Sequence, residues 1–121
     1  MADVVYLVQD MLFTSKIREA AKAFGLSVQA TRDAAALVAN AAGNAKLVIV
    51  DLRLPFALDA LAALAANPTA KDVPSIGFID HEKTDVMAEA LARGCSQVMA
   101  KGQFSNTLPR VMAELAPPPA A

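Results

Sequence analysis

The sequence contains very little cysteine and histidine. Cys95 and His81 are the single members of these two residue types among 121 residues. One cysteine cannot form an internal disulfide bond, which favours a reducing compartment such as the cytoplasm. One cysteine and one histidine are too few to build a zinc site, and no oriented partner of His81 suggests a Ser-His-Asp arrangement. We therefore expect that the protein is not an enzyme.

A large net charge and long apolar runs are absent as well. The net charge is −1, and no cluster of lysine or arginine is present, which argues against nucleic acid as a partner. The apolar runs at 4–8 and 47–50 are far too short to cross a bilayer. The first residues include Asp3 and lack the basic start and long apolar stretch of a signal peptide. The sequence thus predicts a cytoplasmic protein that binds neither nucleic acid nor membranes.

What the sequence has instead is an alternation of short apolar segments with helical patterns. The apolar segments are rich in β-branched and aliphatic residues, as is typical of buried parallel strands. The segments between them consist of good helix formers with apolar residues at helical spacing. The predicted strands are 4–8, 26–30, 47–50, 75–79 and 97–100, and the predicted helices are 15–24, 32–42, 58–66, 84–93 and 105–116, with Thr84 as an N-cap and Pro109 near the first turn of its helix.

Five strands alternating with five helices predict an α/β fold with a doubly wound, five-stranded parallel sheet. The common strand order for five such units is 2-1-3-4-5, the flavodoxin-like (βα)5 arrangement. We expect a single domain over residues 1–116. The remaining segment 117–121 is rich in proline and alanine and is predicted to be a disordered tail.

Charged residues follow three of the predicted strands. Asp10 comes after the first strand, Asp51 after the third and Lys101 after the fifth. Because the carboxyl ends of parallel strands meet at one edge of the sheet, we expect these side chains to share a cleft there. Taken alone, Asp51 remains open to a second interpretation, an aspartate that ends a strand and forms a turn or caps a helix.

In this order and at these strand ends, the motifs resemble the receiver domain of two-component response regulators. The segment DLRLP (51–55) is similar to the family's phosphoacceptor motif, and GCSQVMAK (94–101) is similar to the approach to the family's lysine. The resemblance implies that Asp51 accepts a phosphoryl group and that Lys101 contacts the phosphoryl oxygens. It also implies a magnesium ion held by Asp10, Asp51 and the backbone carbonyl of Arg53.

Four positions depart from the family pattern and indicate an atypical receiver. Gln9 replaces the first of two metal-binding acids, so it reaches the metal only weakly through a water molecule and Mg²⁺ is expected to bind weakly. Ile79 replaces the hydroxyl residue that bonds the phosphoryl oxygen. Asp80 adds a negative charge where a small residue is usual, and Val98 replaces a mobile aromatic residue. We expect an impaired metal site and an impaired switch.

The resemblance implies a stand-alone domain in phosphorelay signalling. Its expected partners are a histidine kinase or phosphotransfer protein and a downstream protein target, while a homodimer stays open. The expected target face combines the helix at 84–93, the strand at 97–100 and the helix at 105–116, with Met87, Val98 and Phe104. The alternative function is a pseudo-receiver that serves as an interaction or dimerisation module without phosphorylation.

Overall fold

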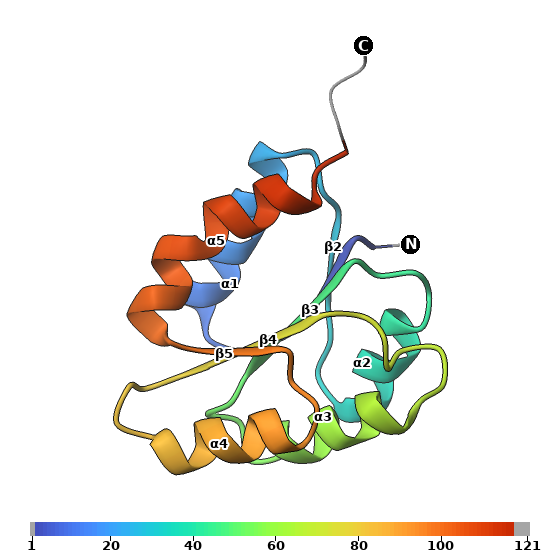
Figure 1. Cartoon of the computed structure of the whole chain (residues 1–121). Coiled ribbons are helices and arrows are strands. Elements are labelled where there is room, and N and C mark those ends of the chain that lie inside the picture. Colours follow the sequence, from blue (N-terminus) through green and yellow to red (C-terminus); the bar gives the residue numbers. More distant parts are fainter. Residues whose placement is uncertain (1, 118–121) are drawn as a thin grey trace.

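The computed structural model describes residues 2–117, in which five strands alternate with five helices (Figure 1). The strands are β1 (Val4–Leu7), β2 (Val28–Ala30), β3 (Leu47–Asp51), β4 (Ser75–Ile79) and β5 (Gln97–Ala100). The helices are α1 (Met11–Ala23), α2 (Ala34–Ala41), α3 (Ala57–Ala66), α4 (Thr84–Ala92) and α5 (Lys101–Leu115). The predicted fold class is confirmed. Pro117 follows α5, whereas the rest of the expected tail lies outside the described residues.

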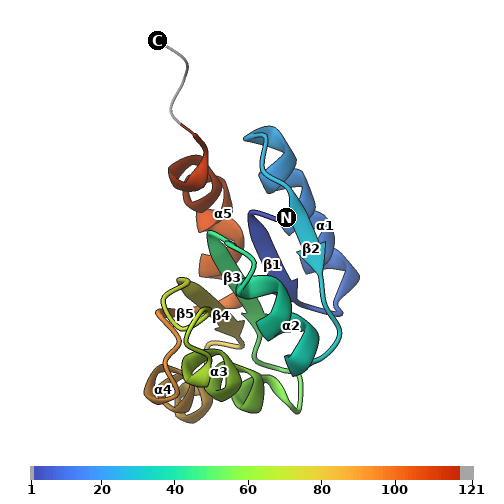
Figure 2. The ribbon, with the colours of Figure 1, turned by 90° about the vertical axis from the view of Figure 1, so that its right-hand side faces the viewer.

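The strands form one parallel sheet in the order β2-β1-β3-β4-β5, as predicted. In Figure 2, β2 lies at one edge of the sheet and β5 at the other. The register pairs Leu7 of β1 with Val50 of β3, and Asp51 with Phe78 of β4. The carboxyl ends of β1, β3 and β4 therefore lie side by side, at what we call the carboxyl edge.

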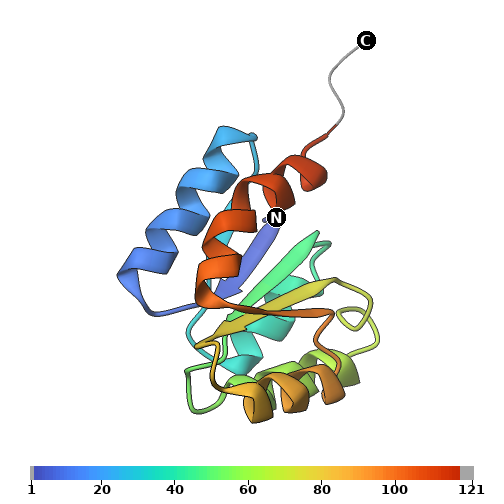
Figure 3. The same cartoon turned by 60° about the vertical axis from the view of Figure 1, so that its left-hand side comes forward.

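Two layers of helices cover the two faces of the sheet. Helices α1 and α5 lie side by side on one face (Figure 3), and α2, α3 and α4 lie on the other. Alternate residues of β1, β3, β4 and β5 supply the two cores, as the pleat of a strand requires. Cys95 is buried in the core on the α2–α4 face and its thiol pKa is raised by burial, so it is a structural residue.

Helix α1 begins at Met11, four residues before the predicted start. The cause is Asp10, whose Oδ1 accepts hydrogen bonds from the backbone N–H of Leu12 at 2.8 Å and of Phe13 at 3.2 Å. Such a carboxylate N-cap satisfies amide groups that the first turn leaves without helical partners. Asp10 therefore caps α1, in addition to the metal-binding role predicted for it.

Two local predictions about helix starts are wrong. Thr84 is the first residue of α4 rather than its N-cap, which is Lys83 and makes no side-chain capping bond. Helix α5 begins at Lys101, so Pro109 lies in its interior instead of its first turn. The buried residues Phe104, Leu108 and Met112 recur at four-residue spacing along α5, and their packing on the sheet outweighs the usual cost of an internal proline.

No helix within residues 2–117 combines the length and apolar character needed to cross a membrane.

Candidate functional site at the carboxyl edge

Asp51 is the last residue of β3 and is almost completely buried, with 2% of its surface exposed. Asp10 follows β1 on the neighbouring strand, and its side chain is about one-third exposed. We call this pair of carboxylates the acidic centre. Two carboxylates from distant parts of the chain are thus held close together, and such a pair is stable only when cations or hydrogen-bond donors offset the negative charge.

The cation that offsets this charge is the side chain of Arg53. Its Nε donates to Oδ1 of Asp51 at 2.9 Å, and its Nη2 donates to Oδ2 of Asp51 at 2.7 Å. The same Nη2 also donates to Oδ2 of Asp10 at 3.1 Å. The backbone N–H of Arg53 adds a further bond to Oδ1 of Asp51 at 2.9 Å. Arg53 therefore clamps Asp51 in a bidentate pair and joins it to Asp10.

The sequence does not predict that the Arg53 side chain pairs with these carboxylates. From the sequence, only the backbone carbonyl of Arg53 is expected to contribute to the site. One signal was available: an arginine stands two residues after an aspartate that ends a buried strand. A turn follows the strand at that point, which allows the side chain to fold back over the carboxylate. Spacing alone could not distinguish this arrangement from an arginine that extends into water.

The guanidinium of Arg53 rests on aromatic rings. Its central carbon lies 5.4 Å from the ring centroid of Phe13 and 5.8 Å from that of Phe78. We call these two rings the aromatic floor. They stack on each other at 4.7 Å, and Phe104 stacks on Phe78 at 4.4 Å and lies 6.0 Å from Phe13, so the three rings form a triangular cluster. A planar cation over aromatic rings gains a favourable cation–π interaction.

These contacts change the acidity of the groups that take part. The hydrogen bond to Asp51 raises the pKa of the Arg53 guanidinium, and Asp10 contributes in the same direction. The backbone N–H of Phe13 is the largest cause that lowers the pKa of Asp10 below its ordinary value of 3.8, and Arg53 lowers it further. The folded protein therefore favours the charged forms of both groups.

We expect the acidic centre to lose stability in acid through Asp10. Its folded pKa lies below the unfolded value, so its contribution is fully present above about pH 4 and is lost as the pH falls through the folded pKa. The variant Asp10→Asn keeps a good N-cap but carries no charge to lose. Urea unfolding of both proteins between about pH 6 and pH 3 should therefore show a smaller loss of stability for the variant. Parallel losses in the two proteins would show that Asp10 is not the titrating group.

Lys101, the cationic side chain predicted for the cleft, is paired elsewhere. Its Nζ lies 2.6 Å from Oδ1 of Asp80, the residue that follows β4. The hydrogen bond from Lys101 is the largest cause that lowers the pKa of Asp80. The two residues line a hollow of about 410 Å³ together with His81, which is exposed. The ammonium group of Lys101 is thus held by Asp80 and not by Asp51.

The donor set at the acidic centre does not fit a magnesium ion while Arg53 is in place. Both oxygens of Asp51 accept from Arg53, and those of Asp10 accept from the α1 amides and from Arg53. Among residues 2–117, no three His, Cys, Asp or Glu side chains gather where they could hold a metal ion. Mg²⁺ requires several free oxygen ligands in octahedral geometry. A metal ion would therefore have to displace the guanidinium.

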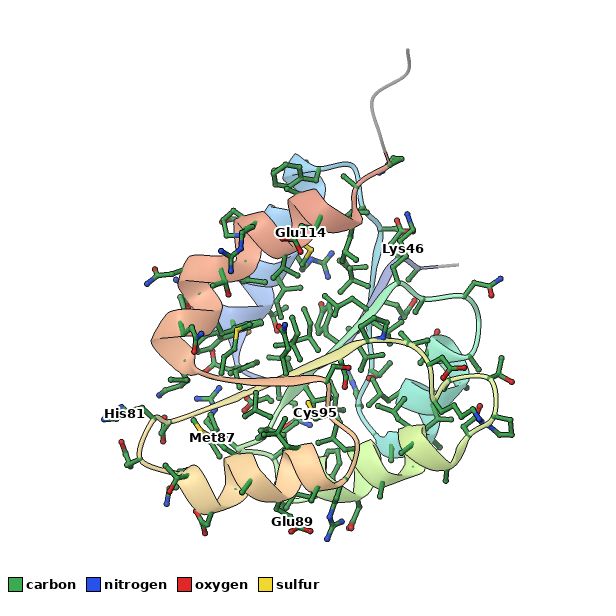
Figure 4. The ribbon with its side chains drawn as sticks, viewed as in Figure 1. Lys46, His81, Met87, Glu89, Cys95 and Glu114 are labelled. Atoms are coloured by element: carbon green, nitrogen blue, oxygen red, sulfur yellow. The ribbon has the colours of Figure 1, made fainter. Side chains whose placement is uncertain are left out.

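The residues expected at the switch and on the target face lie in different surroundings. Ile79 is buried in the core on the α2–α4 face, and Val98 packs against that core from β5. Met87 also packs there and points from α4 toward the sheet, whereas Glu89 points away from it (Figure 4). Phe104 is only 1% exposed in the other core, so its predicted place on a partner face is wrong. Its ring is used in the aromatic stack instead.

Neither a protein-family model nor a curated protein matches this sequence significantly. Solved structures do match over nearly the whole chain. A response regulator from Hahella chejuensis superposes with a TM-score of 0.80 at 16% identity, covering 100% of this chain and 99% of that one. The receiver domain of a sensor histidine kinase from Pseudomonas aeruginosa, described with a magnesium ion in its active-site cleft, has a TM-score of 0.77 at 18% identity, covering 94% and 96%.

A chemotaxis response regulator from Vibrio cholerae gives a TM-score of 0.75 at 18% identity, covering 95% of this chain and 98% of the other. At such identities the similarity establishes the fold. The chain therefore has the fold of response-regulator receiver domains, as the sequence motifs led us to expect. The low identities agree with the expectation of a divergent sequence.

Proposed function

We propose that this chain is a divergent receiver domain that takes part in two-component signal transduction through contacts with other proteins. The observation that carries the proposal is the position of Asp51, buried at the end of β3 in a sheet of receiver order, with Asp10 beside it. Ligands of such sheets bind where the winding reverses, which is between β1 and β3. Asp51 is accordingly the candidate phosphoacceptor, and Lys101 is the candidate cation for the phosphoryl oxygens.

The proposal includes an impaired response to phosphorylation. Arg53 donates hydrogen bonds to both carboxylate oxygens of Asp51, and Lys101 is paired with Asp80. Ile79 offers no hydroxyl group to a phosphoryl oxygen. Mg²⁺ would bind weakly to Asp10, Asp51 and the Arg53 carbonyl, with Gln9 acting through water. The Arg53 side chain would first have to leave. The upstream partner would be a histidine kinase or phosphotransfer protein.

The Arg53 clamp specifically favours a second candidate function, a pseudo-receiver that binds its partner without phosphorylation. An Asp51 carboxylate already paired with a cation needs neither a metal ion nor a phosphoryl group to be neutralised. The surface around α4 and β5, including Met87 and Val98, would then bind the partner constitutively. Both candidates act through protein contacts, and they differ only in whether Asp51 is chemically modified.

A small phosphodonor separates the two candidates. We expect that incubation with Mg²⁺ and acetyl phosphate will modify only a minor fraction of the chains with one phosphoryl group. The Asp51→Ala variant should show no such adduct by intact-mass spectrometry, because the reactive carboxylate is absent. Since Arg53, Asp80 and Ile79 weaken the coupling, beryllofluoride should leave the amide NMR signals around Met87 and Val98 nearly unchanged.

Complete absence of the adduct in the wild type would favour the pseudo-receiver. Stoichiometric modification with large shifts around Met87 and Val98 would contradict the impaired switch. Once a partner is known, its affinity for Asp51→Ala provides a further check. A tenfold loss, equivalent to about 1.4 kcal/mol, with the fold intact would show that Asp51 controls binding.

A further inference from the structure

We propose that Arg53 is a built-in counterion that takes the place of a divalent metal ion at the acidic centre. The centre is then a site for a planar guanidinium cation, and Mg²⁺ competes with the chain's own side chain for Asp10 and Asp51. This inference deepens the proposed function, since it names what controls access to Asp51. The competition itself can be measured whether or not Asp51 is ever phosphorylated.

The hydrogen bonds favour a guanidinium over other cations. Asp51 is contacted through Nε and Nη2, which lie on one side of the planar group and match the two carboxylate oxygens. The side chain of Asp51 is only 3% exposed, so water cannot easily replace these bonds. Arg53 comes from the adjoining turn, and closing such a short loop costs little conformational entropy. A lysine ammonium would offer no comparable fork.

The aromatic floor favours the same kind of cation. Phe13 and Phe78 face the guanidinium carbon at 5.4 and 5.8 Å, and neither ring supplies an oxygen ligand. Guanidinium is weakly hydrated and gains from contact with aromatic faces. Mg²⁺ holds its hydration water tightly and binds through oxygen atoms. The carboxylates and the rings together therefore form a cradle that suits guanidinium better than a hydrated magnesium ion.

The Arg53 side chain lowers the net negative charge that a divalent ion meets at the acidic centre. Asp10 and Asp51 contribute two negative charges, Arg53 contributes one positive charge, and Lys101 is already paired with Asp80. Gln9 supplies no third charge. A divalent ion would find one net negative charge with Arg53 present and two without it. Removal of Arg53 should therefore strengthen the attraction for a divalent cation.

The test is a magnesium titration of the full chain, followed by amide NMR. We expect Arg53→Ala to bind Mg²⁺ at least tenfold more tightly than the wild type, and the double variant Gln9→Asp, Arg53→Ala to bind more tightly still. Arg93→Ala is the matched control, because Arg93 also pairs with two carboxylates, Asp59 and Glu89, on the surface. This control should bind Mg²⁺ within about twofold of the wild type, since a distant surface charge is largely screened.

Methylguanidinium provides the second arm of the experiment. It should bind to Arg53→Ala, shift the amides of Asp10 and Asp51, and weaken the binding of Mg²⁺. In the wild type it should have no such effect, because Arg53 fills the cradle. Arg53→Lys should bind Mg²⁺ with intermediate affinity, since its ammonium retains the charge but not the fork.

Equal Mg²⁺ affinity in the wild type and Arg53→Ala would overturn the inference, and so would a folded Arg53→Ala that bound neither Mg²⁺ nor methylguanidinium. If Arg53→Ala does not fold, the Nε–H signal of Arg53 in the wild type gives the answer. Saturating Mg²⁺ should move this signal toward that of a solvent-exposed arginine, and an unchanged signal with Mg²⁺ bound beside Asp51 would overturn the competition. No arm of this experiment requires phosphorylation. Its results therefore test the inference whether or not acetyl phosphate modifies Asp51.

Discussion

Replacement of Phe78 by alanine is expected to lower the free energy of unfolding by about 3–5 kcal/mol. Phe78 is completely buried in β4, where its ring stacks on those of both Phe13 and Phe104. Truncation removes the apolar surface of the ring and leaves a cavity that the strand cannot close. It also removes half of the aromatic floor beneath Arg53. Chemical unfolding followed by circular dichroism measures this loss.

Two further substitutions separate the parts of the Phe78 effect. Phe78→Leu retains most of the apolar volume, so we expect it to cost less than about 1.5 kcal/mol. Phe24→Ala removes a ring that is 37% exposed at the end of α1, and its cost should be the smallest of the three. A loss below about 1 kcal/mol for Phe78→Ala would mean that the aromatic stack is not a main support of the core.

Gly77→Val should also destabilise the protein strongly, by about 2–3 kcal/mol, the upper part of the range for overpacked cores. A Cβ atom on Gly77 would lie 2.9 Å from Cδ1 of Leu52 and 3.1 Å from its Cγ. Leu52 is itself buried, which leaves its side chain little room to move. Because Leu52 stands between Asp51 and Arg53 in the chain, its displacement should also disturb the arginine clamp.

A double-mutant cycle tests the assigned cause of the Gly77 effect. Leu52→Ala alone should cost about 2–5 kcal/mol through the cavity that it creates. In the Gly77→Val background it should cost at least about 1 kcal/mol less, because the smaller side chain relieves the clash. Strictly additive losses, measured by urea unfolding of the four proteins, would show that Gly77 and Leu52 do not conflict.

The alternation of apolar segments with helical patterns was sufficient to predict the fold and the strand order. Residues 4–8, 47–50 and 75–79 are nearly continuous apolar runs, and such runs are buried on both faces of a parallel sheet. Right-handed crossovers leave few ways to connect five such strands. These are local and topological constraints, and they act in the same way whatever the neighbouring side chains are.

Helix boundaries and surface positions were predicted less well, for reasons that lie in packing. Asp10 starts α1 early because its carboxylate finds two backbone amides, and α5 tolerates Pro109 because its apolar face is held by the sheet. The sequence predicts Phe104 on a partner face, yet its ring packs in a cluster with rings from α1 and β4. Periodicity shows which residues are apolar, but it does not show which distant ring each will meet.

The sequence by itself determined that Asp51 ends a central strand and that the ends of β1 and β3 meet. Only the tertiary structure decided which cation each carboxylate receives. Asp10 and Asp51 share Arg53, while Asp80 holds Lys101 at 2.6 Å. The physical reason is that ion pairing depends on distance, burial and hydrogen-bond direction at the scale of a few ångströms. For Arg53 these quantities depend on Asp10, Phe13 and Phe78, which come together only when the chain is folded.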